Sequence, residues 1–141
     1  MEVNWLAILV CGVAAMFVGM LWHSKALFGD AYMKAIGGDP NMPAEKMAEI
    51  QKKMWQLYIT QFVLVLLQVW VLWFYIGGAI EVMSPLSNAF WIWLGFVLPT
   101  VAGTWMWSAR PRKWAWKGFL ISAGYNLVLF IVFALILGAW M

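Results

Sequence analysis

The chain has 141 residues, of which 65% are hydrophobic and only 11% charged, and its formal net charge is +3. Soluble domains carry about 45–50% apolar and about 25% charged residues, so a water-soluble fold of this length is excluded. Backbone groups in lipid must be hydrogen-bonded within their own segment, which favours helices. The composition therefore predicts an all-α integral membrane protein whose main partner is the lipid bilayer.

Four stretches contain no Asp, Glu, Lys or Arg: residues 3–24, 54–80, 82–109 and 118–141. Crossing the hydrocarbon core takes roughly 20 apolar residues. We expect helices over about 3–22, 54–78, 88–108 and 118–140, forming an antiparallel four-helix bundle in a single transmembrane domain, 1–141. The first is expected to be a permanent helix, because no basic residue precedes it and no A-x-A cleavage pattern follows.

The segment 23–53 between the first two spans is the only sizeable polar stretch. It begins with His23, the only histidine, and contains the chain-breaking Gly37-Gly38-Asp39-Pro40. After this break, Met47, Ile50, Met54 and Leu57 recur at helical spacing. We expect a helical loop here, either extending the second span out of the membrane or lying on the membrane surface.

Neutral polar residues occur inside the second and third spans. Gln61 and Gln68 are seven residues apart and so share one face of a helix. In the third span, Pro99 removes a backbone donor and predicts a kink. Thr100 and Thr104 follow it and could compensate through their hydroxyl groups.

All nine basic residues fall in two connections, 23–53 and 109–117. The second connection holds Arg110, Arg112, Lys113 and Lys117, which form an inner basic face. Because Lys and Arg mark the cytoplasmic side, both termini are expected on the non-cytoplasmic side. The simplest interpretation of this face is proximity to anionic lipid, and no nucleic-acid partner is inferred.

Polar side chains of the fourth span, Ser122, Tyr125 and Asn126, fall at the same depth as those of the other spans. One interpretation is hydrogen bonding between helices. The other is a polar pocket open to the cytoplasmic side and walled by Trp70 and Trp105, whose candidate residues are His23, Gln61, Gln68, Thr100, Thr104, Tyr125 and Asn126.

The chain contains 12 tryptophans, most of them near the predicted span ends. Indole prefers the membrane–water boundary, where its ring is buried and its N–H stays hydrated. We therefore expect Trp5, Trp73, Trp91, Trp93 and Trp140 near the outer boundary, and Trp22, Trp55, Trp105, Trp107, Trp114 and Trp116 near the inner one.

The chain also resembles a known family, the domain-of-unknown-function 1761 family of small bacterial membrane proteins. The resemblance is carried by Asn4-Trp5-Leu6-Ala7, Gly19 with Trp22, Leu27-Phe28-Gly29, Met33, Gly37, Trp93-Leu94-Gly95-Phe96-Val97, Arg110, Ile121, Gly124-Tyr125 and Leu137-Gly138-Ala139-Trp140. His23 and Pro99 depart from it, standing where a Tyr and a Thr are usual. The resemblance implies four helices and a bacterial origin, and it implies no activity. We expect a multi-pass protein of the bacterial cytoplasmic (inner) membrane.

Three functions stay open. An accessory or structural subunit, packing against other membrane proteins, a larger complex or itself, is favoured by the absence of catalytic motifs. A binder or transporter of a small molecule or lipid is favoured by the polar cluster and Pro99. A membrane enzyme would need His23, Tyr125 or the Arg110–Lys117 cluster to meet a donated cofactor; the chain itself predicts no metal, cofactor or catalytic residue.

Overall fold

The computed structural model describes residues 2–141 and contains seven α-helices and one π-helical turn. The elements are α1 (Trp5–Trp22), α2 (Gly29–Ala35), α3 (Ala44–Lys53), α4 (Trp55–Ala79), α5 (Pro85–Ile92), the π-turn η1 (Trp93–Val97), α6 (Leu98–Met106) and α7 (Arg112–Ala139). Four helical units are long and apolar enough to span a membrane: α1, α4, α7 and the continuous run Pro85–Met106. The predicted all-α fold with four candidate spans is confirmed.

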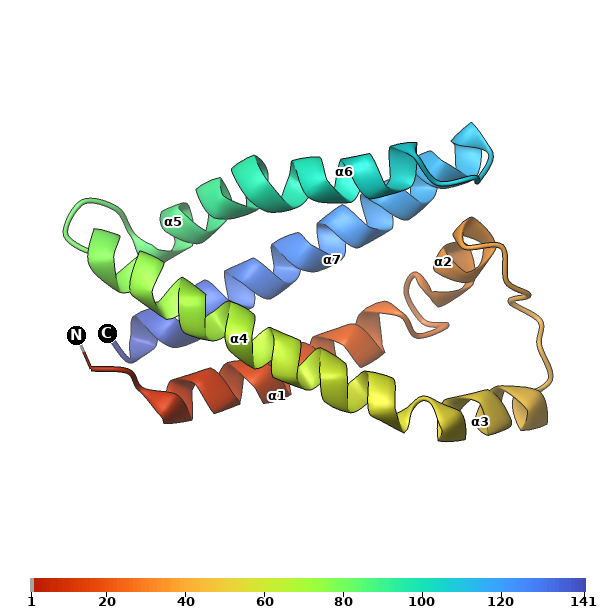
Figure 1. Cartoon of the computed structure of the whole chain (residues 1–141), viewed down its shortest axis with the longest axis horizontal. Helices are drawn as coiled ribbons and strands as arrows, with labels where there is room; N and C mark the ends of the chain where they lie inside the picture. The colour runs from red at the N-terminus through yellow and green to blue at the C-terminus, as the bar shows by residue number, and fades with distance from the viewer. Residues whose placement is uncertain (1) are drawn as a thin grey trace.

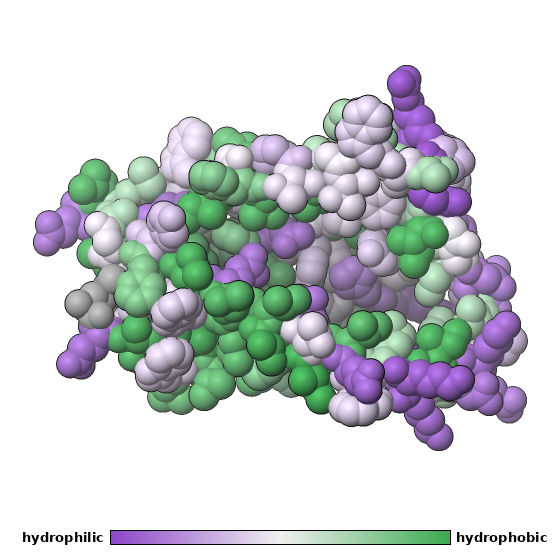
Figure 2. Space-filling view, viewed as in Figure 1, coloured by the Kyte–Doolittle hydropathy of each residue, from purple (hydrophilic) through white to green (hydrophobic). Residues whose placement is uncertain are grey.

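The long helices lie roughly alongside one another, and the two ends of the molecule differ (Figure 1). Both chain ends and the α4–α5 turn lie at one end, here called the terminal end. Helices α2 and α3 and the α6–α7 turn lie at the other, here called the basic end because all Lys and Arg belong to the segment between α1 and α4, to the α6–α7 turn or to the start of α7. Figure 2 shows the same separation, with hydrophilic residues gathered at the two ends of a largely apolar body.

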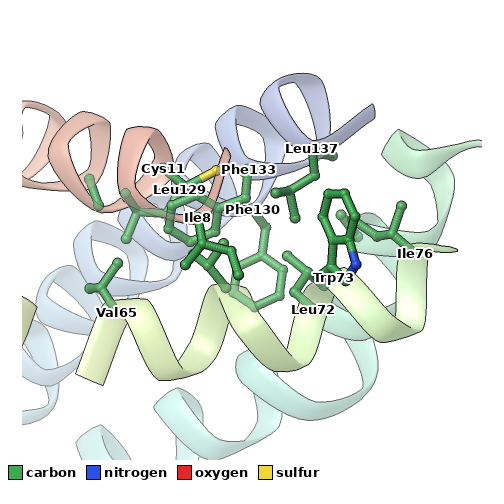
Figure 3. Packing of buried hydrophobic residues seen from close by; sticks show 14 of the residues in the cluster. Ile8, Cys11, Val65, Leu72, Trp73, Ile76, Leu129, Phe130, Phe133 and Leu137 are labelled. Atoms are coloured by element: carbon green, nitrogen blue, oxygen red, sulfur yellow. The ribbon is translucent and has the colours of Figure 1, made fainter. Parts of the chain in front are cut away.

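Helix α7 is the centre of the packing, since it contacts α1, α2, α4, α5, η1 and α6. Its Phe133 and Leu137 are fully buried and meet Cys11 of α1 and Ile76 of α4 in one apolar cluster (Figure 3). The small residues of α1 serve close approach: a Cβ on Gly12 would lie 2.7 Å from Leu66 Cδ2 of α4. Without a hydrophobic driving force in lipid, such close packing is what holds spanning helices together.

Packing is uneven along α4. Its buried residues are Val65, Val69, Leu72, Trp73 and Ile76, so none lies in the first ten residues at the basic end. From residue 55 to residue 64 every side chain is exposed except half-buried Phe62, which packs beside Gly12 of α1. The predicted bundle is therefore compact at the terminal end and open at the basic end.

The third span contains a π-turn immediately before Pro99. Leu98 N–H bonds to Trp93 O, five residues back, and Thr100 Oγ1 donates to Phe96 O at 2.6 Å. Proline lacks the N–H and its ring crowds the carbonyl four residues back, and a widened turn is one way a helix accommodates this strain. Figure 1 shows the α5–η1–α6 helix changing direction along its length.

The fourth span begins earlier than the expected residue 118. Pro111 precedes the helix in an extended conformation, with ψ 143°, and α7 starts at Arg112. Arg112, Lys113 and Lys117 therefore lie in the first two turns of α7 and not in a connecting turn. The expected boundary marked where charge ends, whereas the helix starts directly after Pro111, its extended N-cap residue.

Candidate functional site

Three tryptophan side chains converge on one turn of α7. Trp22 Nε1 of α1 donates to Ile121 O at 3.1 Å, and Trp93 Nε1 of η1 donates to Ala123 O at 3.1 Å. Trp105 Nε1 of α6 donates to Ser122 Oγ at 3.2 Å. Residues 121–123 thus receive hydrogen bonds from three other helical segments, which sets the position of α7 within the molecule.

Two of the tryptophans expected near the outer boundary are buried within the bundle. Trp73 is 3% exposed and Trp93 9% exposed. Depth along a span does not determine which face a side chain occupies. Trp93 faces α7, where its Nε1 donates to Ala123 O, and Trp73 belongs to the buried apolar cluster. By contrast Trp5, Trp55, Trp91, Trp107, Trp116 and Trp140 are exposed, as boundary residues are.

At the basic end, aromatic rings from four helical segments meet around His23. Its ring makes edge contacts with Tyr32 of α2 and Tyr125 of α7, with centroids 4.9 and 5.1 Å apart, and its Nδ1 lies 3.0 Å from Gly19 O. Tyr32 also meets Trp105 of α6 at 6.3 Å. Sequence reasoning singled out His23, Tyr125 and Trp105 but missed Tyr32, because it missed α2.

Helix α2 ends in a signal that the sequence does contain. Gly37 has φ +88°, Gly38 N–H bonds to Met33 O at 2.8 Å, and Gly37 N–H bonds to Lys34 O at 3.2 Å. This is a Schellman motif, which closes a helix with glycine in the left-handed region. Asp30 in the first turn and Lys34 in the last complement the helix dipole.

Arg110, in the α6–α7 turn, is hydrogen-bonded to the last turn of α2. Its Nε donates to Ala35 O at 2.8 Å and its Nη2 to Lys34 O at 3.1 Å. These carbonyls belong to the last turn of α2, where a cation is favourable. A Cβ on Gly37 would lie 3.0 Å from Arg110 Nη1, so the glycine also leaves room for the guanidinium group.

The seven candidate pocket residues fall into separate groups. His23 and Tyr125 belong to the aromatic cluster at the basic end. Thr100 and Thr104 are exposed on α6, where their hydroxyls donate to Phe96 O of η1 and to Thr100 O of α6, within the same span. Asn126 Nδ2 likewise donates to Ser122 O within α7 at 2.9 Å. Gln61 is exposed on α4, while half-buried Gln68 lines a groove between α4 and the α5–η1 segment.

This groove runs between α4 and the α5–η1 segment and is called the α4–α5 groove. It encloses about 410 Å³, its floor includes Phe130 of α7, and Ile92 and Phe96 lie on the far wall. Gln68 and Tyr75 are the polar side chains in its lining. Of the two tryptophans expected as pocket walls, Trp70 does not line this groove but packs edge-on against Phe74 at 5.5 Å.

One face of α4 beside this groove has a regular pattern. Positions alternate in steps of four and three residues, and this set is called the α4 seam: Leu57, Gln61, Leu64, Gln68, Val71 and Tyr75. All six are exposed except half-buried Gln68. Alternating steps of four and three describe the contact face of two helices that pack side by side with a left-handed twist.

Among residues 2–141, no three His, Cys, Asp or Glu side chains come together in a way that could hold a metal ion. Two lysines in the first turns of α7 contact an aromatic ring. Lys117 Nζ lies 4.7 Å and Lys113 Nζ 5.5 Å from the centre of the Trp114 ring. Cation–π contacts of this kind suit the boundary layer of a membrane, where a ring is partly desolvated.

Four long apolar helices, with charge confined to the chain segments outside them and to the first two turns of α7, define a multi-pass membrane protein. The comparison with known families then places it: residues 6–138 match the family described as "Protein of unknown function (DUF1761)". The chain belongs to this family, as the resemblance indicated. No curated protein and no solved structure matches it.

Proposed function

We propose that this chain is an accessory or structural subunit of a bacterial cytoplasmic membrane, which associates through the α4 seam with another membrane protein or with a second copy of itself. The basic end would face the cytoplasm, since Lys and Arg are retained on that side. Both termini and the α4–α5 turn would then lie outside.

The observation that carries this proposal is the uncovered α4 seam. Leu57 is 61%, Leu64 53% and Tyr75 63% exposed, although the seam has the spacing of a helix contact face. Lipid can cover the apolar members, but it offers no hydrogen-bond partner for the amides of Gln61 and Gln68 within the hydrocarbon. A neighbouring helix laid along the seam would supply one.

Replacing both glutamines by leucine is expected to weaken the association. An interhelical polar contact contributes roughly 0.6–2 kcal/mol, which corresponds to a roughly 3- to 30-fold weaker association for each residue. Complexes extracted from native membranes with a mild detergent would be measured by native gel, and self-association in vesicles by energy transfer between labelled chains.

Gln56→Leu is the matched control, because Gln56 is exposed on the same helix but outside the α4 seam. The proposal predicts that Q56L leaves the assembly intact while the Q61L/Q68L variant reduces it. A wild-type chain that migrates alone from native membranes and shows no energy transfer in vesicles would contradict it.

A second candidate function, a small-molecule or lipid binder or transporter, is favoured by the α4–α5 groove. In Figure 2 the face between α4 and α6 is hollowed, and hydrophilic residues are visible in its depth. Such a cleft, mostly apolar with a few polar groups, is typical of a ligand site.

An alanine scan of the seven candidate residues separates the two functions: His23, Gln61, Gln68, Thr100, Thr104, Tyr125 and Asn126. For a binder, the Gln68→Ala variant should lose a ligand that copurifies with the wild-type chain while keeping its unfolding midpoint. Loss of stability without any loss of ligand would speak against the binder, because it is the result that purely structural hydrogen bonds predict.

A further inference from the structure

A second cavity lies at the basic end, between the end of α6 and the start of α7, away from the α4 seam. It encloses about 550 Å³. Arg110 and Arg112 line it at the turn, and its apolar walls include Ala102, Trp105, Trp116 and Phe119. The cavity is therefore cationic at one end and apolar along the rest.

We propose that this cavity binds one anionic phospholipid of the inner leaflet, with the phosphate between Arg110 and Arg112 and the upper part of an acyl chain against the aromatic wall. From Arg112 to Phe119 the helix rises about 10 Å. The cavity thus extends from the headgroup layer into the hydrocarbon, which is the arrangement of one lipid molecule. This proposal is independent of association through the α4 seam.

The charge at the cavity is complementary to a phosphate. No carboxylate is among the residues that line it. Arg110 has two of its five N–H groups on the carbonyls of α2, which leaves others free. Exposed Arg112 is the first residue of α7, a helix with no acidic residue in its first turn and no side-chain cap. The positive end of the helix dipole therefore adds to the two guanidinium charges.

The apolar wall distinguishes a lipid from a free anion. Trp105 is held in place by its hydrogen bond to Ser122 Oγ, and its ring lies directly against Gly118. Trp116 is 60% exposed and packs on Phe119 with ring centroids 5.9 Å apart. A phosphate ion would use only the arginine end, whereas a phospholipid would also cover these rings.

Native mass spectrometry of the detergent-purified chain, with phosphatidylglycerol and phosphatidylcholine added in turn, tests the proposal. The wild type should retain one phosphatidylglycerol per chain and bind phosphatidylcholine more weakly. Arg112→Gln should weaken phosphatidylglycerol binding roughly five-fold, the ratio corresponding to about 1 kcal/mol per basic residue at an anionic surface. Ala115→Trp, which fills the cavity, should also weaken it, and both variants should keep the wild-type unfolding midpoint.

Lys46→Gln is the charge control, because Lys46 is exposed on α3, which directly precedes α4 in the chain and does not line the cavity. Equal weakening by Lys46→Gln would overturn the proposal in favour of diffuse electrostatic attraction. Displacement of the bound lipid by excess inorganic phosphate, with no effect of Ala115→Trp, would also overturn it, because the site would then be one for a free anion. Equal retention of phosphatidylglycerol and phosphatidylcholine would overturn the proposal that the arginines select an anionic lipid.

Discussion

Replacing Gly118 by alanine is expected to be among the most destabilising single changes at the basic end. Gly118 is buried, and a Cβ placed on it would overlap the ring of Trp105. An indole cannot bend out of the way, so the ring must rotate and leave its hydrogen bond to Ser122. Overpacking typically costs about 1–3 kcal/mol, and the lost interhelical bond adds roughly 0.6–1.7 kcal/mol.

Gly103→Ala is the matched control for this change. A Cβ on Gly103 meets nothing within 4 Å, although the residue lies in the same helix as Trp105. Both variants gain the same helix propensity, about 0.8–1.0 kcal/mol, so the difference between their unfolding free energies in mixed micelles isolates the steric effect. Equal stability of the two variants would show that Trp105 is free to move and that α6 and α7 are not fixed by it.

The number and approximate position of the spans could be predicted from the sequence because hydrocarbon excludes charge. The absence of Asp, Glu, Lys and Arg over residues 3–24 or 54–80 is a direct consequence of that exclusion. A helix boundary follows a different rule. Helix α7 starts after Pro111 and continues through Arg112, Lys113 and Lys117, because the first turns protrude beyond the uncharged stretch.

The face that each residue occupies was much harder to predict. In a soluble helix the apolar stripe marks the core, but a spanning helix is apolar on all sides. The residues that flank Trp73 and Trp93 in the sequence do not distinguish a core position from a lipid-facing one, and both side chains are buried. Gln61 and Gln68 are the exception, because their seven-residue spacing alone places them on one face.

The same contrast between predictable depth and unpredictable lateral position holds for the candidate site. The sequence grouped seven polar residues by depth, whereas the structure sets Thr100 and Thr104 on the surface of α6 and His23 with Tyr125 in an aromatic cluster. Depth is set by position along a helix and can be read from residue number. The distance between two side chains at the same depth depends on which helices pack together. The exposure of α4 at the basic end results from that packing and cannot be predicted from composition.

The aromatic cluster, the tryptophan contacts on α7 and Arg110 together explain why the basic end keeps a defined shape although α4 leaves it open. Helix α2 is too short to be stable alone. It is held by Tyr32 against His23 and Trp105 and by Arg110 at its last turn. The segment between the first two spans is thus tied to the α6–α7 turn, far from it in the chain.

Arg110→Gln is accordingly expected to release α2. Hydrogen bonds from a charged donor contribute about 1.5–3 kcal/mol, and because Arg110 is only half-buried the lower end of that range applies. Loss of the bonds to Lys34 O and Ala35 O should raise amide hydrogen exchange across residues 29–38 roughly tenfold. Exchange in α7 beyond its first turns should stay unchanged. Arg110→Lys should restore little, since an ammonium group cannot reproduce the two-pronged guanidinium contact.

Lys113→Gln removes the same charge three residues away and serves as the comparison. Lys113 is exposed and lies over the Trp114 ring. If Arg110 acts through its two bonds to α2, only its substitution should accelerate exchange there. If the two variants accelerate exchange equally, the effect comes from net charge at the basic end, and α2 is held mainly by its aromatic contacts.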